Sequence, residues 1–323
     1  MRSFIETISE QILAGTPIQR QTAQQLTQCS DSHMLWSAAD AIRRHFMGDY
    51  FHLCSIINAR SGNCTENCRF CAQSARYQTE AETYALVDRQ EAMAIALDNE
   101  AHGVHRLSLV TSGHSVDTAT LEELAKLYDQ INEQTSMDLC ASMGFLNQKR
   151  AKQLVAAGVS RYHCNMETNE QRFVEVCSTH MWQDKVDTLD IAAKAGMSIC
   201  SGGIIGMGEA MDDRIELALE LRQLAVKSIP INILTPIAGT PFADLEPLPI
   251  EEVLTTIALF RFINPDAVIR IAGGRQQLGT DQYRCFAAGA DGAIVGNYLT
   301  TAGSSIAEDL AAVKKMGFKF VCV

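Results

Sequence analysis

The sequence predicts a (β/α)8 barrel of the TIM type, preceded by a helical N-terminal segment. Short runs of apolar and β-branched residues alternate with longer helical patterns from about residue 50 to residue 300. Eight such runs occur, and eight βα repeats are the number that closes this barrel. No phosphate-binding G-x-G-x-x-G follows the first run, which disfavours the alternative of a doubly wound open sheet.

The predicted strands and helices follow one another without interruption. The expected strands are 51–58, 104–111, 137–143, 160–166, 197–203, 229–235, 267–273 and 292–297. Residues 121–132 and 212–226 show helical periodicity between them. Gly103, Gly158 and Gly196 each stand between a helical pattern and the next strand, where a left-handed C-cap needs a residue without Cβ.

One domain is expected to hold most of the chain. The barrel covers residues 49–303, residues 1–48 form the N-terminal helical segment, and residues 304–323 form a C-terminal helix and tail of the same domain. No Ser/Pro-rich linker or low-complexity stretch divides it.

The composition excludes several classes of function. The 323 residues include 27 Lys and Arg against 38 Asp and Glu, a net charge of −11, which disfavours nucleic-acid binding by bulk charge. No apolar run approaches the roughly 20 residues that cross a bilayer. The opening stretch MRSFIETISEQILAG has acidic residues where a signal peptide has a basic segment and an apolar core. We therefore expect a soluble, cytoplasmic protein that binds neither nucleic acid nor membrane.

The cysteines are the main candidates for functional residues. There are eleven, an odd number, so complete intramolecular pairing is impossible, and clustered cysteines in a cytosolic chain are metal ligands or catalytic thiols more often than disulfides. Cys64, Cys68 and Cys71 form a C-x3-C-x2-C loop directly after the first strand, at the barrel end where active sites lie. Three thiolates on a tight loop hold three corners of a cuboidal iron–sulfur cluster and leave the fourth iron open to bind substrate.

Two other interpretations of this loop are weaker. A zinc site would need a second pair of ligands, and none is evident downstream. A ferredoxin-type electron carrier would need a fourth nearby cysteine in C-x2-C-x2-C-x3-C-P order, which is absent.

The loop, with an aromatic residue before its last cysteine, resembles that of the radical S-adenosylmethionine (SAM) superfamily, whose unique iron chelates the amino acid end of SAM. Further stretches resemble the biotin synthase family, and they span most of the barrel. They are CAQSARY (71–77), YHCNMET (162–168), CSGGIIGMGE (200–209), PINIL (230–234), GTP (239–241) and RIAGGR (270–275).

The resemblance implies a role for each matched residue. Cys64, Cys68 and Cys71 would hold a [4Fe-4S] cluster. For SAM it implies Phe70, Gly202 and Gly203 near the adenine, Asn165 and Glu167 at the ribose, and Lys185 at the carboxylate. Lys185 stands where the family has Arg, so the two parallel hydrogen bonds of a guanidinium would be replaced by the single charge of an ammonium group. Asn232 would hydrogen-bond the ureido ring of dethiobiotin, because an amide both donates and accepts.

The family's second, sacrificial [2Fe-2S] cluster is bound by three cysteines and an arginine, and here the pattern departs. Cys140, Cys200 and Arg270 match three of these positions, but Ser108 stands at the fourth, and a hydroxyl is a poor iron ligand. Cys164 appears where the family has His. Cys140, Cys164 and Cys200 are therefore expected to hold an auxiliary four-iron cluster with an extra sulfide, in preference to a [2Fe-2S] cluster.

Arg270 is then expected to be a catalytic cation beside the auxiliary cluster. The other cysteines are interpreted as ordinary thiols, with Cys285 as a possible spare ligand. They are Cys29, Cys54, Cys177, Cys285 and Cys322.

The resemblance as a whole implies SAM-dependent radical insertion of sulfur into dethiobiotin to form biotin, with the sulfur supplied by the auxiliary cluster. It also implies a homodimer and an electron donor such as flavodoxin or ferredoxin. The alternatives are a related barrel radical enzyme, either a hydrogenase-cofactor maturase or a lipoyl-type sulfur inserter, and, from another class, an iron–sulfur carrier.

Overall fold

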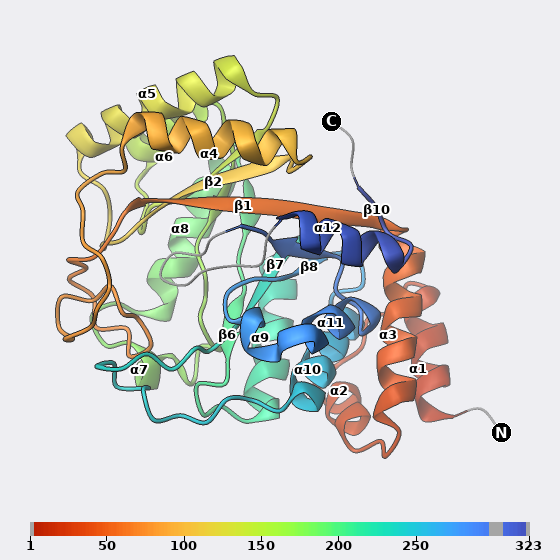
Figure 1. The fold of residues 1–323 in the computed structure, drawn as a ribbon. Coiled ribbons are helices and arrows are strands. Elements are labelled where there is room, and N and C mark those ends of the chain that lie inside the picture. The colour runs from red at the N-terminus through yellow and green to blue at the C-terminus, as the bar shows by residue number, and fades with distance from the viewer. Residues whose placement is uncertain (1–2, 297–305, 321–323) are drawn as a thin grey trace.

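Three helices precede the first strand and pack together at the amino-terminal side of the molecule (Figure 1). The computed structural model describes residues 3–296 and 306–320. The helices are α1 (Phe4–Leu13), α2 (Arg20–Thr27) and α3 (Ser32–Met47). A capping box begins α1, in which Ser3 Oγ accepts from Glu6 N and the Glu6 carboxylate accepts from Ser3 N. Because α3 packs against α10 (Ile250–Ile263), these helices cover one flank of the barrel.

The strands form one curved parallel sheet. They are β1 (Tyr50–Arg60), β2 (Arg106–Thr111), β3 (Asp138–Ser142), β4 (Val159–His163), β5 (Ser198–Cys200), β6 (Gly203–Ile205), β7 (Ser228–Ile233), β8 (Val268–Ile271), β9 (Gly292–Ile294) and β10 (Lys319–Phe320). Within the described residues the order is β5-β4-β3-β2-β1-β9-β8-β7-β6, and β10 pairs with the start of β1.

The first and last strands of this order, β5 and β6, follow one another directly in the chain. β5 pairs with β4 on one side, while β6, which follows directly, pairs with β7 on the other. Between them Ser201 N donates to Ser228 O at 3.1 Å. The nine strands of the path thus occupy eight positions, because β5 and β6 share one, and the predicted (β/α)8 barrel is confirmed.

Helices surround this ring (Figure 1). The remaining ones are α4 (Arg89–Ala101), α5 (Thr118–Gln134), α6 (Gln148–Ala156), α7 (Phe173–Val176), α8 (Trp182–Lys194), α9 (Met211–Gln223), the 3-10 helix η1 (Arg275–Tyr283), α11 (Arg284–Ala287) and α12 (Ile306–Lys315). The two helical patterns predicted at 121–132 and 212–226 fall on α5 and α9. The three predicted glycine caps are also confirmed, with φ of 78° at Gly103, 84° at Gly158 and 96° at Gly196.

Two predicted strands have the wrong bounds, and both lie beside the cavity described in the next subsection. The single strand expected at 197–203 is divided into β5 and β6, because the chain changes its partner from β4 to β7 there. The strand expected at 160–166 ends at His163, and Glu167 has a left-handed backbone with φ of 68°. Residue 297 of the last predicted strand, and the predicted boundary between residues 303 and 304, lie outside the described residues.

The divided strand depends on two glycines that meet neighbouring backbone. A Cβ on Gly202 would lie 1.8 Å from Pro230 O, and one on Gly203 would lie 2.8 Å from Glu167 O. These glycines are therefore required by the close approach of β4, the 198–205 segment and β7.

We predict that Gly202→Ala lowers the free energy of unfolding by about 2–3 kcal/mol, because the new methyl group overpacks against a fixed carbonyl. Gly196→Ala is the matched control. Nothing lies within 4 Å of its Cβ, and its positive φ alone costs about 1 kcal/mol. Urea denaturation measures both variants, and equal losses would contradict the steric explanation.

Candidate active site

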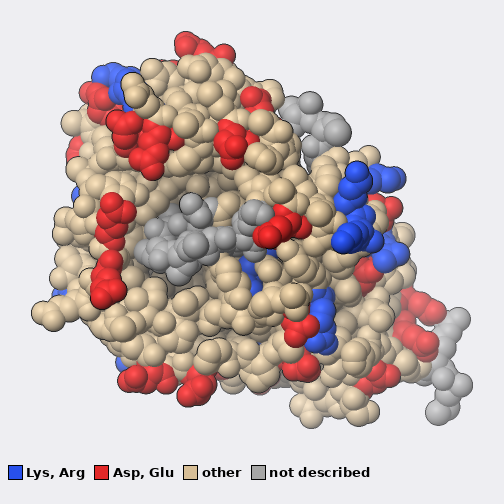
Figure 2. Space-filling view, in the orientation of Figure 1, with Lys and Arg blue, Asp and Glu red and all other residues tan. Residues whose placement is uncertain are grey.

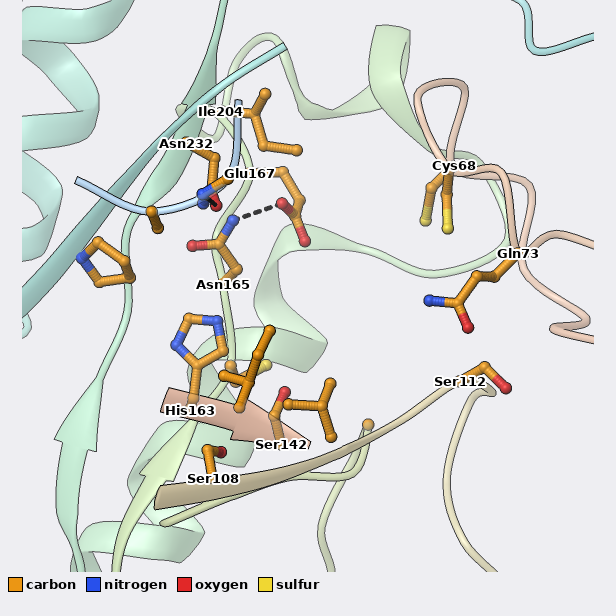
Figure 3. A pocket seen from close by; sticks show the side chains of 18 of the residues that line it. Cys68, Gln73, Ser108, Ser112, Ser142, His163, Asn165, Glu167, Ile204 and Asn232 are labelled. Atoms are coloured by element: carbon orange, nitrogen blue, oxygen red, sulfur yellow. Dashed lines mark hydrogen bonds between the residues drawn. The ribbon is translucent and has the colours of Figure 1, made fainter. Parts of the chain in front are cut away.

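A cavity of about 440 Å³ opens at the carboxyl ends of the strands and continues into the barrel (Figure 3). Twelve of the residues singled out in the sequence line it, and Gly202 and Gly203 do not. The twelve are Cys64, Cys68, Phe70, Cys71, Cys140, Cys164, Asn165, Glu167, Lys185, Cys200, Asn232 and Arg270. One end, formed by Cys64, Cys68 and Cys71, is called the cluster-loop end. The other, where Arg106, Arg161 and Arg270 line the cavity, is called the arginine end.

The cluster loop is held by its own hydrogen bonds. Cys64 N donates to Gln73 O at 3.0 Å, Ala75 N donates to Cys64 O at 2.8 Å, and Cys71 N donates to Cys68 O at 3.0 Å. Burial raises the pKa of the Cys71 thiol to about 11. The loop therefore presents three thiols to one cavity.

Across the cavity from Cys68 lies a polar group from the end of β4 (Figure 3). Asn165 Nδ2 donates to Glu167 Oε2 at 2.5 Å, and Gly202 N donates to Asn165 Oδ1 at 3.0 Å. Lys185 Nζ lies 3.3 Å from Glu167 Oε1, and this ion pair raises the pKa of the Lys185 ammonium although its burial opposes the shift. The group offers both acceptors and a cation to a ligand that faces the cluster loop.

Phe70 forms part of an apolar wall beside this group. It packs against a small buried cluster made of Val176, Met207, Leu234 and Phe242. Such a wall suits a flat, weakly polar ring.

Asn232 fixes the neighbouring strands as well as lining the cavity. Its Nδ2 donates to Gly203 O at 3.1 Å, and its Oδ1 accepts from Gly273 N at 3.0 Å. An amide has two N–H donors and two oxygen lone pairs, so one of each is left for a ligand.

Side chains on the barrel strands alternate between the helices and the interior. Leu107 and Leu109 are buried in the apolar core, whereas Ser108 between them lines the cavity. Ser108 pairs with Cys140, and Cys140 pairs with Arg161, so these three share the interior face.

Cys54 belongs to the same interior face. Ile56, two residues further along β1, pairs with Ser108, and alternate residues of a strand point to the same side. Cys54 is buried and lines the cavity, and burial raises the pKa of its thiol. The thiol interacts electrostatically with both Cys140 and Cys200.

The arginine end links these thiols to guanidinium groups. Arg106 Nη1 donates to Cys140 Sγ at 3.5 Å. Arg270 Nη1 donates to Ser228 Oγ at 2.9 Å, and Ser228 Oγ donates to Cys200 Sγ at 3.3 Å. Arg270 is buried, and among the described residues its Nε has no hydrogen-bond partner.

The guanidinium charges lower the pKa values of the two histidines nearby. Burial, together with the charge of Arg270, lowers the pKa of His52 to about 3. Burial and the charge of Arg106 lower the pKa of His105 to about 4. Burial alone would raise the pKa of Cys200, but the charge and hydrogen bond of His163 lower it to about 6. The arginine end is therefore electropositive and favours an anionic occupant.

Cys164 has a different environment from the thiols at the arginine end. His163, not Cys164, pairs with Cys200 across β4 and β5. Cys164 packs in the apolar core, and the charges it senses are those of Lys185 and Glu167. The structure thus places Cys164 with the residues that face the cluster loop.

Two thiols that the sequence analysis did not assign to the site lie in or beside the cavity. Cys54 and Cys177 were interpreted as ordinary thiols. If the register between β1 and β2 had been known, the alternation of side chains along β1 would have placed Cys54 on the same face as Ser108 and Cys140. Cys177 gives no such signal, because it is 109 residues from Cys68 in the chain and yet its Sγ lies 3.7 Å from Cys68 Sγ.

Glu66 joins the cluster loop to the turn that contains Cys177. Its Oε2 lies 2.5 Å from His180 Nδ1 and accepts from Thr179 Oγ1 at 2.6 Å, and its Oε1 lies 3.0 Å from His114 Nδ1. Burial opposes ionisation of this carboxyl, but the hydrogen bonds from Thr179 and His180 lower its pKa to about 2. Glu66 therefore stays ionised and fixes the turn against the loop.

On the face drawn in Figure 2, carboxylates are scattered widely and most basic side chains gather in one region.

Across the described residues, no helix combines the length and apolar character needed to cross a bilayer.

Two family models match the chain. The radical SAM superfamily matches residues 59–221, and the Biotin and Thiamin Synthesis associated domain matches residues 230–319. The curated relatives include three proteins named biotin synthase. That of Desulfotalea psychrophila is 51% identical over 98% of this chain and 95% of its own length. That of Acetivibrio thermocellus is 49% identical over 90% of both chains, and that of Clostridium tetani is 44% identical over 98% of both.

Solved structures resemble the fold at much lower identity. Methylornithine synthase superposes with a TM-score of 0.82 at 18% identity over 97% of both chains. The FeFe-hydrogenase maturase of Carboxydothermus hydrogenoformans superposes with a TM-score of 0.81 at 17% identity, over 98% of this chain and 79% of the maturase. At these identities the likeness concerns the barrel alone.

Proposed function

We propose a division of roles among the cavity residues from the premise that the chain belongs to the biotin synthase family, radical SAM enzymes that convert dethiobiotin to biotin. The observation that supports it is one cavity with three loop thiols at one end and buried thiols among arginines at the other. When bound, the [4Fe-4S] cluster supplies the electron that cleaves SAM, and the auxiliary cluster supplies the sulfur.

Cys64, Cys68 and Cys71 are the proposed ligands of the [4Fe-4S] cluster. The donor set fits, because three thiols on one short loop face the same cavity and leave one iron for the cosubstrate. The barrel around them excludes water from the reacting groups.

The residues opposite the loop are proposed to bind SAM. Asn165 and Glu167 offer hydrogen-bonding groups to the ribose hydroxyls, and Lys185 offers its charge to the carboxylate. Phe70 lies beside the adenine. Gly202 and Gly203 act indirectly, because their lack of a Cβ lets the 198–205 segment approach β4 and β7.

For the auxiliary cluster we propose Cys54, Cys140 and Cys200 as ligands, and we favour four irons with an extra sulfide over [2Fe-2S]. This differs from the set of Cys140, Cys164 and Cys200 expected from the sequence. Cys54 lies on the strand face of Cys140 and interacts electrostatically with Cys140 and Cys200. Cys164 also lines the cavity, but it packs in the apolar core and senses only the charges of Lys185 and Glu167. The unpartnered Nε of buried Arg270 suits an anionic sulfur cluster, beside which this cation would act in catalysis.

Dethiobiotin is proposed to lie between the two ends, with its ureido group on the free N–H and lone pair of Asn232. Family membership further supports a homodimer, flavodoxin or ferredoxin as electron donor, and a cytoplasmic location. A reducing compartment is what cluster-binding thiolates require.

Cys68→Ala is expected to abolish the reductive cleavage of SAM and to remove one cluster, because two thiolates do not hold the open-iron cluster. Product analysis of 5′-deoxyadenosine and an iron count measure this. Cys29→Ala, in the connection between α2 and α3, is the matched control and should keep both. Undiminished 5′-deoxyadenosine from Cys68→Ala would overturn the assignment.

The auxiliary ligands are tested in the background of the Cys64/Cys68/Cys71 triple alanine variant. About four irons per chain and a four-iron Mössbauer signature are expected there, and about two irons would instead indicate [2Fe-2S]. Adding Cys54→Ser should remove this iron, whereas adding Cys164→Ser should leave it. The reverse pattern would restore Cys164 as the ligand.

Asn232→Ala should weaken dethiobiotin binding by about 1–3 kcal/mol, the usual cost of leaving a buried polar group unpaired. Titration calorimetry measures the affinity. Thermal unfolding of the same variant separates this loss from loosening of the strands that Asn232 also joins. Unchanged affinity in a folded variant would remove Asn232 from the substrate site.

A further inference from the structure

Cys68 has a second thiol beside it that does not belong to the cluster loop. Cys177 follows α7, is buried, and its Sγ lies 3.7 Å from Cys68 Sγ. Two thiolates on one tetrahedral ion, each with a bond of about 2.3 Å, lie about 3.8 Å apart. A disulfide would need about 2.05 Å. The two thiols are therefore in contact but not bonded, at a separation that two ligands of a single metal ion would also have.

His180 supplies a third donor at matching distances. One of its ring nitrogens and the two sulfurs all lie within 4.8 Å of one another. Nδ1 is 3.4 Å from Cys177 Sγ, and a nitrogen and a sulfur on one tetrahedral zinc lie about 3.6 Å apart. The side chain is only 4% exposed, and among the described residues its Nε2 has no hydrogen-bond partner.

The surroundings hold this donor set in place. Phe145 and Phe173 pack against the His180 ring, at centroid distances of 5.0 and 5.5 Å. Glu66 Oε2 lies 2.5 Å from Nδ1, and this hydrogen bond also fixes the orientation of the ring. Two thiols and an imidazole suit Zn²⁺ and Fe²⁺.

We propose that Cys68, Cys177 and His180 bind a single Fe²⁺ or Zn²⁺ ion in the chain that lacks the [4Fe-4S] cluster. The proposal rests on the proposed role of Cys68 as a cluster ligand in one respect. Because both metal centres use this thiol, the single ion and the cluster exclude one another. Iron bound here is positioned for cluster assembly, and zinc bound here blocks it.

Cobalt(II) is the probe that tests the site without any cluster. In the full-length Cys64→Ala/Cys71→Ala variant, which lacks two cluster ligands, anaerobic Co²⁺ should give thiolate-to-cobalt charge transfer and the intense visible bands of a tetrahedral ion. Adding Cys177→Ser or His180→Gln should weaken Co²⁺ binding by about 10–100-fold or more. Adding Cys29→Ser should change nothing.

Two results would overturn the proposal. One is the absence of thiolate charge transfer in the Cys64→Ala/Cys71→Ala variant. The other is binding of equal affinity after Cys177→Ser in a chain whose circular dichroism is unchanged. Either leaves the cluster assignment intact, because that assignment is tested by iron content in the chain with all three loop cysteines.

The exclusion is tested by zinc. The metal-free wild-type chain preloaded with one equivalent of Zn²⁺ should regain the cluster absorption more slowly during iron and sulfide reconstitution than the zinc-free chain. Cys177→Ser should reconstitute at the same rate with and without zinc. An equal zinc effect in both chains would contradict a shared Cys68.

Discussion

Positive charge enclosed in the barrel is the constraint on which the arginine end of the cavity depends. Arg106, Arg161 and Arg270 line the same cavity, and Arg106 has a carboxylate partner, Asp138, that is largely exposed at the rim. Arg270 is bonded to a neutral serine hydroxyl. Buried cations are stable only when they are paired. The thiols that lie between them supply negative charge only when they ionise or bind metal, so an anionic occupant would balance the charge of this interior.

The cluster-loop end achieves its balance in a different way. There each charge already has a partner within the chain: Glu66 contacts His180, and Glu167 contacts Lys185. The position of Glu167 depends on its left-handed backbone and on Ile204 N, which donates to Glu167 O at 2.8 Å. Division of the fifth strand into β5 and β6 therefore serves the site directly, because it lets one segment pair with β4, hold Asn165 and reach β7.

The fold was predictable because its signals are local. Runs of apolar residues, helical periodicity and the glycine caps at Gly103, Gly158 and Gly196 are each read from a few neighbouring residues. The cluster loop was predictable for the same reason. The division at 201–202 was not, since it arises from a change of pairing partner, which is a property of the closed ring. Cys54 was missed because its interior orientation follows from register with β2, and the sequence alone does not give register.

The two ends differ in how much of their geometry the chain holds by itself. At the cluster-loop end, hydrogen bonds within the loop and ion pairs opposite it connect the groups that line the cavity. At the arginine end the hydroxyl of Ser108 and the Nε of Arg270 are buried and, within the described residues, unpartnered, so the protein leaves donors there that only an occupant satisfies. An unsatisfied buried donor costs free energy, and an anionic occupant recovers it. The free energy of binding an anion at the arginine end would therefore include a contribution from the fold itself.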